Sequence, residues 1–362
     1  MGMARWTSVA AAIAMVAFTG AAQAQTKQID MSPAKIRFGY VTGVAFPTII
    51  VAQQKGFFAK ENLTVENIFL AGTGPIIEAL SAGNLDMGNS TPLLAIAATA
   101  KGGAKTTLVS AHEYSLTDKQ GNQFEGAYIT VRRGEGIKEL KDLKGKRVAI
   151  NDIGSSYTYF MRAKMVEMGM NPDKDLTIIP VPFNQMAGAL LQNQVDAMVA
   201  SADGLLQARD RAPVDVIGTQ TTLEGLDISV TSSISVNNEF YKKNPDVVVR
   251  FIRAELAARV WMDAALAKRD PELFDIVAAS MKYTPERSKA FWETRGGYYG
   301  KDTELVNLMD LPRRLIERQI VVAKTSGLVS KDANLSYEML MDQKPLKEAT
   351  ASLGLKWDPA KD

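Results

Sequence analysis

Residues 63–88, LTVENIFLAGTGPIIEALSAGNLDMG, contain the pattern that decides the fold. A β-rich run at 63–70 is followed by a glycine-containing turn at 71–75, a short helix reaching residue 82 and a second short strand at 85–88. Two strands joined through a helix predict a parallel pair, with the helix covering one face of the sheet.

The same alternation extends to both sides of this stretch. A strand at 35–41 precedes a helix opened by Pro47, and a helix opened by Thr91 and Pro92 leads to a strand at 106–111. The pattern then restarts, with strands expected at 126–133, 147–151, 176–181, 197–200 and 214–218 and helices beginning near residues 136, 155, 185 and 203. The fold class predicted is α/β, with two units that each contain a mainly parallel sheet covered on both faces.

The last third of the chain is β-rich at 228–236 and then helical, with helices expected at 245–267, 271–280, 285–292 and 303–324. We expect this part to return to the first unit, so that the chain crosses between units near 112–126 and again near 219–230. Two crossings form a hinge, and a hinge between two lobes makes a cleft that can close. The predicted organisation is a signal peptide at 1–24, a leader at 25–34, lobe 1 at 35–112, lobe 2 at 113–227, and a return to lobe 1 with C-terminal helices at 228–362.

The N-terminus has the order of a cleavable export signal. Arg5 precedes an apolar run at 9–18, and small residues follow, ending in AQA at 22–24. The apolar run is shorter than the roughly 20 residues of a membrane-spanning helix, although an uncleaved anchor is the alternative interpretation. We expect cleavage after Ala24 and a soluble mature protein in the periplasm.

Composition excludes several classes of function. The 42 basic and 40 acidic residues nearly cancel, which does not favour nucleic acid or an anionic membrane as a partner. The chain has no cysteine and one histidine, His112, so thiolate catalysis, cysteine metal sites and a histidine-rich zinc site are excluded. A Ser-His-Asp triad would have to use His112. We expect no metal and no cofactor.

Four segments carry a resemblance to a known family. They are FFAKENLTVE at 57–66, ALSAGNLDMG at 79–88, IKELKDLKGKRVA at 137–149 and QVDA at 194–197. In order and spacing they resemble periplasmic substrate-binding proteins of ABC importers of the nitrate/sulfonate/taurine type, a group that includes SsuA and THI5-like proteins. The resemblance covers about residues 35–265. It departs from the family at Asn62, where glycine is usual, and at 202–204, where ADG replaces an acid-Pro or Trp-x-Pro segment.

The resemblance implies a type II periplasmic-binding-protein fold, with two α/β lobes, a two-strand hinge and a helical C-terminal segment. It implies an extracytoplasmic solute-binding component of an ABC importer, serving permease and ATPase subunits at the inner membrane. We expect a monomer that performs no chemistry. The alternatives are a THI5-like enzyme, whose histidine and cysteine-rich motif do not match this chain, and the ligand-binding domain of a sensor.

Ligands of open α/β sheets bind beyond the carboxyl ends of the strands, where helix N-termini present unpaired N–H groups. Loops 71–75, 88–92 and 151–157 have this position and are rich in glycine and hydroxyl side chains, and in the resembled family loop 40–46 lines the cleft. The predicted ligand-binding residues are Tyr40, Thr42, Gly43, Phe46, Gly72, Thr73, Gly74, Ser90, Thr91, His112, Gly154, Ser155, Ser156, Tyr157, Phe183 and Asn184.

Each of these residues has a structural alternative. The glycines at 72 and 74 also suit a plain strand-to-helix turn, the hydroxyls suit helix caps, the aromatic side chains suit a core, and His112 suits a structural hydrogen bond. Helix N-termini and hydroxyls favour an anion, and the aromatic residues leave room for an organic body. The predicted ligand is an aliphatic sulfonate or an aromatic carboxylate, with a thiamine-precursor pyrimidine as the alternative.

Overall fold

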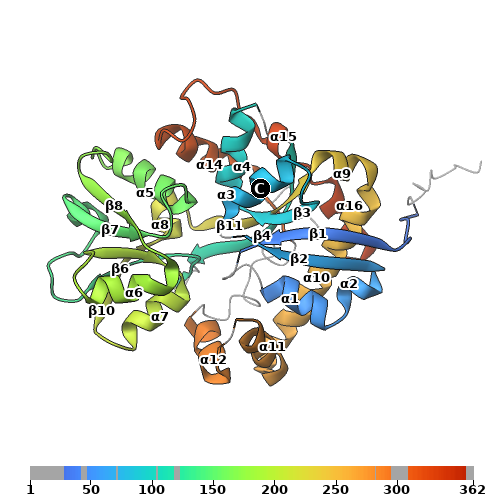
Figure 1. Cartoon of the computed structure of the whole chain (residues 1–362), viewed down its shortest axis with the longest axis horizontal. Helices are drawn as coiled ribbons and strands as arrows, with labels where there is room; N and C mark the ends of the chain where they lie inside the picture. The colour runs from blue at the N-terminus through green and yellow to red at the C-terminus, as the bar shows by residue number, and fades with distance from the viewer. Residues whose placement is uncertain are drawn as a thin grey trace, which may run out of the picture. The chain divides into compact units, whose positions relative to one another are not determined.

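The computed structural model describes residues 28–41, 47–70, 72–102, 105–117, 123–281, 283–294 and 309–355 (Figure 1). The chain divides into two compact units, Met1–Asp30 and Met31–Asp362, and the described strands and helices belong to the second. The predicted signal peptide lies outside the described residues. Within them, no helix has the length and apolar character needed to span a bilayer.

The described strands form two sheets with the same internal order. The first sheet runs β2 (Leu63–Phe69), β1 (Ala34–Tyr40), β3 (Met87–Ser90), β11 (Ile228–Asn237), β4 (Thr106–Thr117) and β5 (Gln123–Phe124). The second runs β8 (Leu176–Pro180), β7 (Lys146–Ile150), β9 (Ala197–Ala200), β6 (Tyr128–Arg132) and β10 (Val214–Thr219). In both, the first three strands are parallel and the fourth is antiparallel to its two neighbours. The predicted class, two α/β lobes, is confirmed.

Helices follow most strands. They are α1 (Pro47–Gln54), α2 (Phe57–Lys60), α3 (Thr73–Ser81), α4 (Pro92–Ala100), α5 (Ser156–Glu167), α6 (Phe183–Leu191), α7 (Ala202–Arg209), α8 (Gln220–Glu224), α9 (Asn238–Lys243), α10 (Pro245–Lys268), α11 (Pro271–Met281), α12 (Pro285–Thr294), α14 (Arg313–Thr325), α15 (Tyr337–Leu340) and α16 (Lys344–Ser352). The helix expected from residue 136 is only a 3-10 turn, Leu140–Leu143. Gly134 and Gly136 precede it with φ of 89° and 78°, which a helix does not accommodate.

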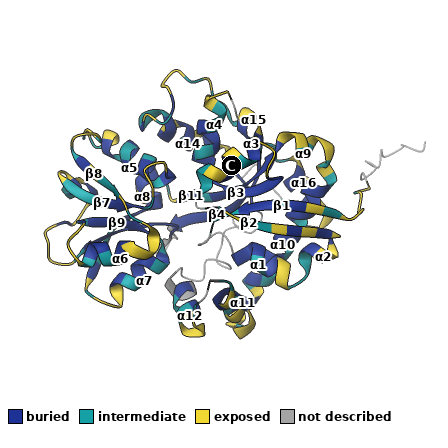
Figure 2. Ribbon diagram, in the orientation of Figure 1, coloured by how far each residue is buried: buried dark blue, intermediate teal, exposed yellow. Residues whose placement is uncertain are grey.

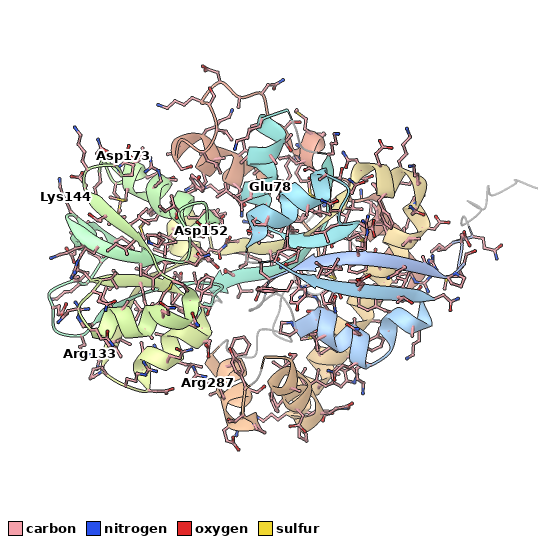
Figure 3. All side chains as sticks on the ribbon, in the orientation of Figure 1. Glu78, Arg133, Lys144, Asp152, Asp173 and Arg287 are labelled. Carbon is pink, nitrogen blue, oxygen red and sulfur yellow. The ribbon has the colours of Figure 1, made fainter. Side chains whose placement is uncertain are left out.

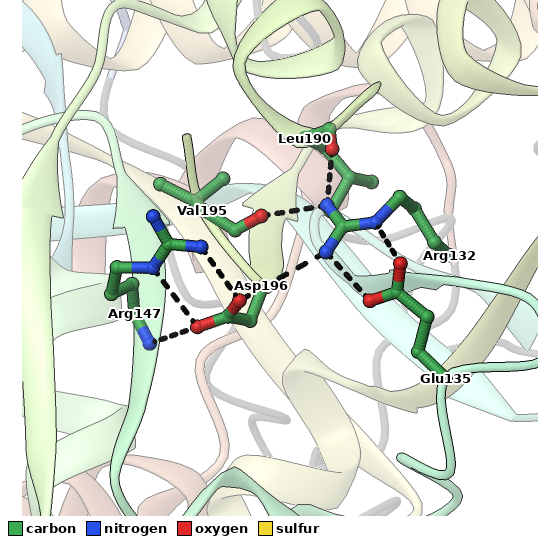
Figure 4. A network of polar contacts seen from close by, with 6 residues as sticks. All are labelled: Arg132, Glu135, Arg147, Leu190, Val195 and Asp196. Carbon is green, nitrogen blue, oxygen red and sulfur yellow. Dashed lines mark hydrogen bonds and ion pairs between the residues drawn. The ribbon is translucent and has the colours of Figure 1, made fainter. Parts of the chain in front are cut away.

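One contact recurs in the two sheets and sets the alignment of neighbouring parallel strands. In the first sheet, Asp86 Oδ2 accepts the main-chain N–H of Arg37 at 2.8 Å and its Nε at 3.1 Å, while Oδ1 accepts Nη2 at 2.6 Å. In the second, Asp196 makes the same three contacts with Arg147 at 2.8, 3.2 and 2.8 Å (Figure 4). The two residues of each pair are 49 positions apart. A carboxylate that binds a guanidinium and a main-chain N–H together fixes both position and direction.

The first sheet is packed on both faces (Figure 2). On one face, Phe251 of α10 stacks on Phe38 and Phe58, with ring centroids 5.3 and 5.2 Å apart. On the other, Ile76 of α3 approaches so closely that a Cβ on Gly88 would lie 2.7 Å from it. Glycine is therefore required at that position by the approach of the helix, not by its φ angle.

The chain crosses between the sheets twice. The first crossing follows β4, which continues to Thr117 instead of ending near residue 111 as expected, because β11 pairs with it as far as Leu116. The second crossing runs from β10 through α8 to β11. As a result, β11 occupies in the first sheet the place that β6 occupies in the second.

We predict that Asp86→Ala and Asp196→Ala each lower the free energy of unfolding by about 1–3 kcal/mol, because each removes the carboxylate that accepts a main-chain N–H and two guanidinium nitrogens. Urea unfolding of the two variants measures this. The control is Glu66→Ala, which removes the exposed Lys35 pair at 2.8 Å and should cost under about 0.5 kcal/mol. Equal effects of the aspartate and Glu66 variants would contradict the proposed role of the contact.

Candidate ligand-binding site

The parallel strands of each sheet end in loops on one edge. In the first sheet these ends are Tyr40, Phe69 and Ser90, and in the second they are Ile150, Pro180 and Ala200. Figure 1 shows β1 and β2 pointing toward the second sheet, and Figure 3 places Asp152, which follows β7, on the edge of the second sheet nearest the first. These two edges carry the loops that sequence analysis selected.

The first edge combines an aromatic pair with an open helix end. Tyr40 and Phe69 meet edge to face, with ring centroids 5.9 Å apart, and Phe69 is 56% exposed. Beside them, α3 begins after Gly72, which is extended and supplies no side-chain cap. Thr73 and Gly74, the first residues of α3, are partly exposed. This edge therefore offers an apolar surface next to main-chain N–H groups of a helix N-terminus that no side chain caps.

The hydroxyls at residues 90 and 91 already have partners inside the protein. Ser90 is fully buried, and its Oγ lies 2.5 Å from Oγ of Ser235 on β11. Thr91 Oγ1 accepts the N–H of Leu94 at 3.4 Å and so caps α4. In the structure, Ser90 and Thr91 make contacts within the protein. Their contact with a ligand stays a prediction.

Asn89 is a positioning residue that sequence analysis did not select. It is 3% exposed, its Oδ1 accepts the N–H of Val41 at 3.3 Å, and its Nδ2 donates to Ser232 at 3.1 Å. It thus holds the start of the loop after β1. The sequence places Asn89 directly before Ser90 at the end of a short strand, and this position could have marked it as a candidate site residue.

On the second edge, the loop after β7 folds on its own hydroxyls. Ser155 is the N-cap of α5 and accepts the N–H of Tyr157 at 3.2 Å, and Ser156 is buried. Asp152 Oδ1 accepts the N–H of Gly154 at 3.1 Å. Gly154 remains exposed, and its neighbour Ile153 is 61% exposed. The surface that this loop leaves open therefore combines the apolar Ile153 and the main chain of Gly154 with the exposed carboxylate of Asp152.

Two further helices begin on the second edge without a side-chain cap. The N-cap of α6 is Pro182, and that of α7 is Ser201, whose hydroxyl does not accept a first-turn N–H. Phe183 is 39% exposed and Asn184 is exposed, so both predicted residues face outward at the start of α6. The second edge repeats the combination of an open helix end and an apolar side chain.

His112 lies away from any exposed surface. It is 1% exposed and is the extra residue of a bulge in β4, where the pairing slips between Ser232 and Ser233 of β11. Its Nδ1 lies 3.4 Å from Oε2 of Glu255, and Arg259 donates to its main-chain O at 2.5 Å. Burial raises the pKa of Glu255 to about 8, against the opposing charge of Arg259. The sequence predicted His112 at the end of a strand, but it lies inside β4.

Thr42, Gly43 and Phe46, also predicted to bind ligand, lie outside the described residues. Tyr157 has a contact with the first crossing, because its hydroxyl donates to the main-chain O of Gly126 at 3.4 Å. The loop of α5 is thereby connected to the hinge.

The two crossings are joined by buried carboxyl groups. Glu125, in the first crossing, accepts the N–H of Thr221 in the second at 3.2 Å and also accepts its hydroxyl. Glu224 accepts from Gln220 at 3.1 Å and from Ser229, and Gln319 of α14 donates to it at 3.4 Å. Both glutamates are at most 1% exposed. Burial raises the pKa of each to about 7, although these hydrogen bonds lower it.

A surface pocket of about 390 Å³ lies between α5 and the turn after α14, and Ile153 of the loop after β7 is one of its lining residues. Its one guanidinium, Arg162, already donates to Asp173 at 2.7 Å and to the main-chain O of Ser326 at 3.2 Å. Because the charge of Arg162 is already paired, this pocket has no advantage over the strand ends as a site for an anion.

Two α/β lobes joined by two crossings define the type II periplasmic-binding-protein fold. The model of the NMT1/THI5-like family matches residues 44–265. The chain belongs to the NMT1/THI5-like family.

Solved structures and relatives agree with this assignment. The nitrate-binding protein NrtA of Synechocystis PCC 6803 is similar at a TM-score of 0.70 and 16% identity, over 89% of each chain. The aliphatic sulphonate binding protein SsuA of Escherichia coli is similar at a TM-score of 0.66 and 19% identity, over 86% of this chain and 93% of its own. A pyrimidine phosphate synthase of Schizosaccharomyces pombe is 24% identical over 217 residues, 57% of this chain and 58% of that enzyme.

We predict that Glu125→Gln and Glu224→Gln flatten the pH dependence of stability. The folded pKa of about 7 exceeds the ordinary 4.5, so the folded state binds protons more tightly than the unfolded state. The contribution of each glutamate to the free energy of unfolding is complete below about pH 4.5. It is lost as the pH rises through 7, at no more than about 1.4 kcal/mol per pH unit for each group.

Urea unfolding between pH 5 and 8 measures this effect. The difference in unfolding free energy between each glutamine variant and the parent should change in favour of the variant as the pH rises. The exposed Glu66→Gln is the control, since its difference should stay constant with pH. Parallel curves for all the variants would show that the two glutamates do not titrate in this range.

Proposed function

We propose that this protein is the extracytoplasmic solute-binding component of an ABC importer and that it captures a small organic anion between its two strand edges. The observation that carries the proposal is the repeated edge. In each sheet, a helix N-terminus without a side-chain cap, α3 or α6, lies beside an exposed aromatic side chain, Phe69 or Phe183.

The open helix ends support an anionic group. Unpaired N–H groups and the helix dipole both favour negative charge at an N-terminus. In the described loops 72–75, 88–92, 151–157 and 181–184 there is no lysine or arginine. Recognition of the anion therefore rests on main-chain donors and not on a bidentate guanidinium.

The exposed apolar side chains support an organic body on that anion. Phe69, Ile153 and Phe183 are 56%, 61% and 39% exposed, and they lie on both edges. A solute with an alkyl or aromatic part would bury them, and an inorganic anion would leave them in water. An aliphatic sulphonate, named for the similar protein SsuA, is an anion with an organic body, whereas nitrate, named for NrtA, is not.

The mechanism that follows is closure. The solute contacts one edge in each lobe and shifts the population toward the closed form by no more than its differential affinity for that form. The permease and ATPase subunits of the importer would recognise the closed form. This proposal includes export by the signal at 1–24, cleavage after Ala24, action in the periplasm as a monomer, and no catalysis.

The alternative is a pyrimidine ligand or a THI5-like synthase activity, which the similarity to the fission yeast enzyme favours. A thermal-shift series with alkanesulfonates, aromatic carboxylates, nitrate and aminopyrimidines separates these cases. A solute at 100 times its Kd should add about 2.7 kcal/mol of stability. Stabilisation by pyrimidines alone, or consumption of an added substrate at a catalytic rate, would contradict the proposal.

We predict that Gly72→Asp and Gly72→Asn separate folding from anion binding. Gly72 has φ of −173°, and a Cβ there would meet nothing closer than 3.7 Å, so both variants fit. Both supply a better N-cap than glycine and should raise stability by a few tenths of a kcal/mol.

Only Gly72→Asp places a negative charge at the start of α3. It should weaken binding of the anion found in the screen at least tenfold relative to Gly72→Asn, as measured by calorimetry. The same comparison at Pro182, the N-cap of α6, tests the second edge. Equal affinities of the aspartate and asparagine variants would exclude the helix ends as the anion site.

A further inference from the structure

Helices α11 and α12 form a connection between the two lobes that is separate from the hinge. Helix α11 packs on α1 and α10, which cover the first sheet, and Lys55, directly after α1, binds Glu272 of α11 at 2.6 Å. Helix α12 is tied to α11, because Ser288 Oγ donates to the main-chain O of Phe274 at 2.9 Å. Helix α12 also packs against α7, which follows β9 of the second sheet (Figure 1).

Arg287 of α12 makes the contact with α7. Its Nε and Nη2 lie 3.0 and 2.7 Å from Asp203 Oδ1, and Nη2 also donates to the main-chain O of Asp203 at 3.0 Å. Its Nη1 donates to Asp210 Oδ2 at 2.9 Å. All three guanidinium nitrogens are thus used on one helix, and Figure 3 shows Arg287 where α12 faces the second lobe. A planar guanidinium held at several points is a specific contact that an ammonium group could not reproduce.

Asp203 is held in place for this contact. Its Oδ2 accepts from Gln207 at 2.7 Å, one turn further along α7, and its side chain is only 20% exposed. Burial of Tyr283, just before α12, raises the pKa of its hydroxyl, and the charge and hydrogen bond of the neighbouring Asp203 raise it further. An acidic side chain in the first turn of a helix is favoured by the helix dipole. Asp203 also belongs to the ADG segment at 202–204, where the chain departs from the resembled family.

We propose that Arg287 is an interlobe latch. Its contacts with Asp203, in the first turn of α7, and with Asp210, the C-cap of that helix, fasten the α11–α12 segment, which is anchored on the first lobe, to the second lobe. The latch favours the arrangement of the lobes described above whether or not a solute is bound.

The reason is geometric. Rotation of the lobes about the two crossings would move α7 away from α12, and the ion pair would have to break first. Removing the pair should therefore increase the population of other lobe arrangements, by roughly fivefold or more. The proposal concerns the protein without solute, so its failure would leave the proposed transport function untouched.

The absence of cysteine makes the test direct, because introduced cysteines are the only labelling points. Lys174→Cys in the second lobe and Lys242→Cys on α9 of the first are both exposed. Spin labels at these two positions report the interlobe distance by pulsed electron resonance on the mature protein without solute. We expect Arg287→Gln and Asp203→Asn each to broaden the distance distribution or add a second population. The reversed pair, Arg287→Asp with Asp203→Arg, should restore the parent distribution in part.

The matched control is Arg133→Gln, which removes an ion pair with Asp215 at 2.8 Å between β6 and β10 of one sheet. It should leave the distribution unchanged. Circular dichroism checks that each variant is folded, and Asp203→Asn carries the test if Arg287→Gln does not fold. Parent-like distributions in both latch variants, or an equal change in Arg133→Gln, would overturn the proposal.

Discussion

An aspartate directly before the central strand of each sheet binds the main-chain N–H and the guanidinium of an arginine on the neighbouring parallel strand. Because Asp86 and Asp196 bind main chain and side chain together, β1 against β3 and β7 against β9 can adopt only one alignment. That alignment brings the carboxyl ends of the strands to a common edge. The contact itself lies at the amino-terminal side of β3 and β9, so the group that sets the register is separate from the edge that we propose binds solute.

The return of β11 to the first sheet, after the strands of the second, explains why the hinge between the lobes is polar. Since β11 belongs to the first sheet and β6 to the second, two segments must run between the sheets, and the described residues Ser115, Glu125, Gln220, Thr221 and Glu224 on them are buried. Buried main-chain groups need partners, and Ser115 and Glu125 accept the N–H groups of Gly126 and Thr221. The side chains of Gln220, Ser229 and Glu224 bond to one another. Such a network keeps the hinge specific, and the buried carboxyls make its stability depend on pH.

The predicted binding loops contain two kinds of hydrogen-bonding group, which are hydroxyl side chains and main-chain N–H groups. The short hydroxyl side chains of Thr91 and Ser155 cap the helices that they precede, and Ser90 bonds within the sheet. Hydroxyls near a helix start are close to first-turn N–H groups, and this local contact competes with a ligand. The starts of α3 and α6, where Gly72 and Pro182 offer no side-chain acceptor, keep their main-chain donors for an external partner.

The sequence by itself determined the two α/β units, most of their strands, the two crossings and the edge on which the candidate loops lie, because these follow from local periodicity and from the rule that parallel strands end together. Only the tertiary structure decided that His112 is enclosed beside Glu255, that Asn89 holds the first loop, and that Arg287 meets Asp203. These contacts join residues between 48 and 143 positions apart, and no local pattern encodes a distance of that kind. The contacts of His112 and Asn89 depend on how elements of the first lobe pack together, and that of Arg287 depends on how α12 meets the second lobe.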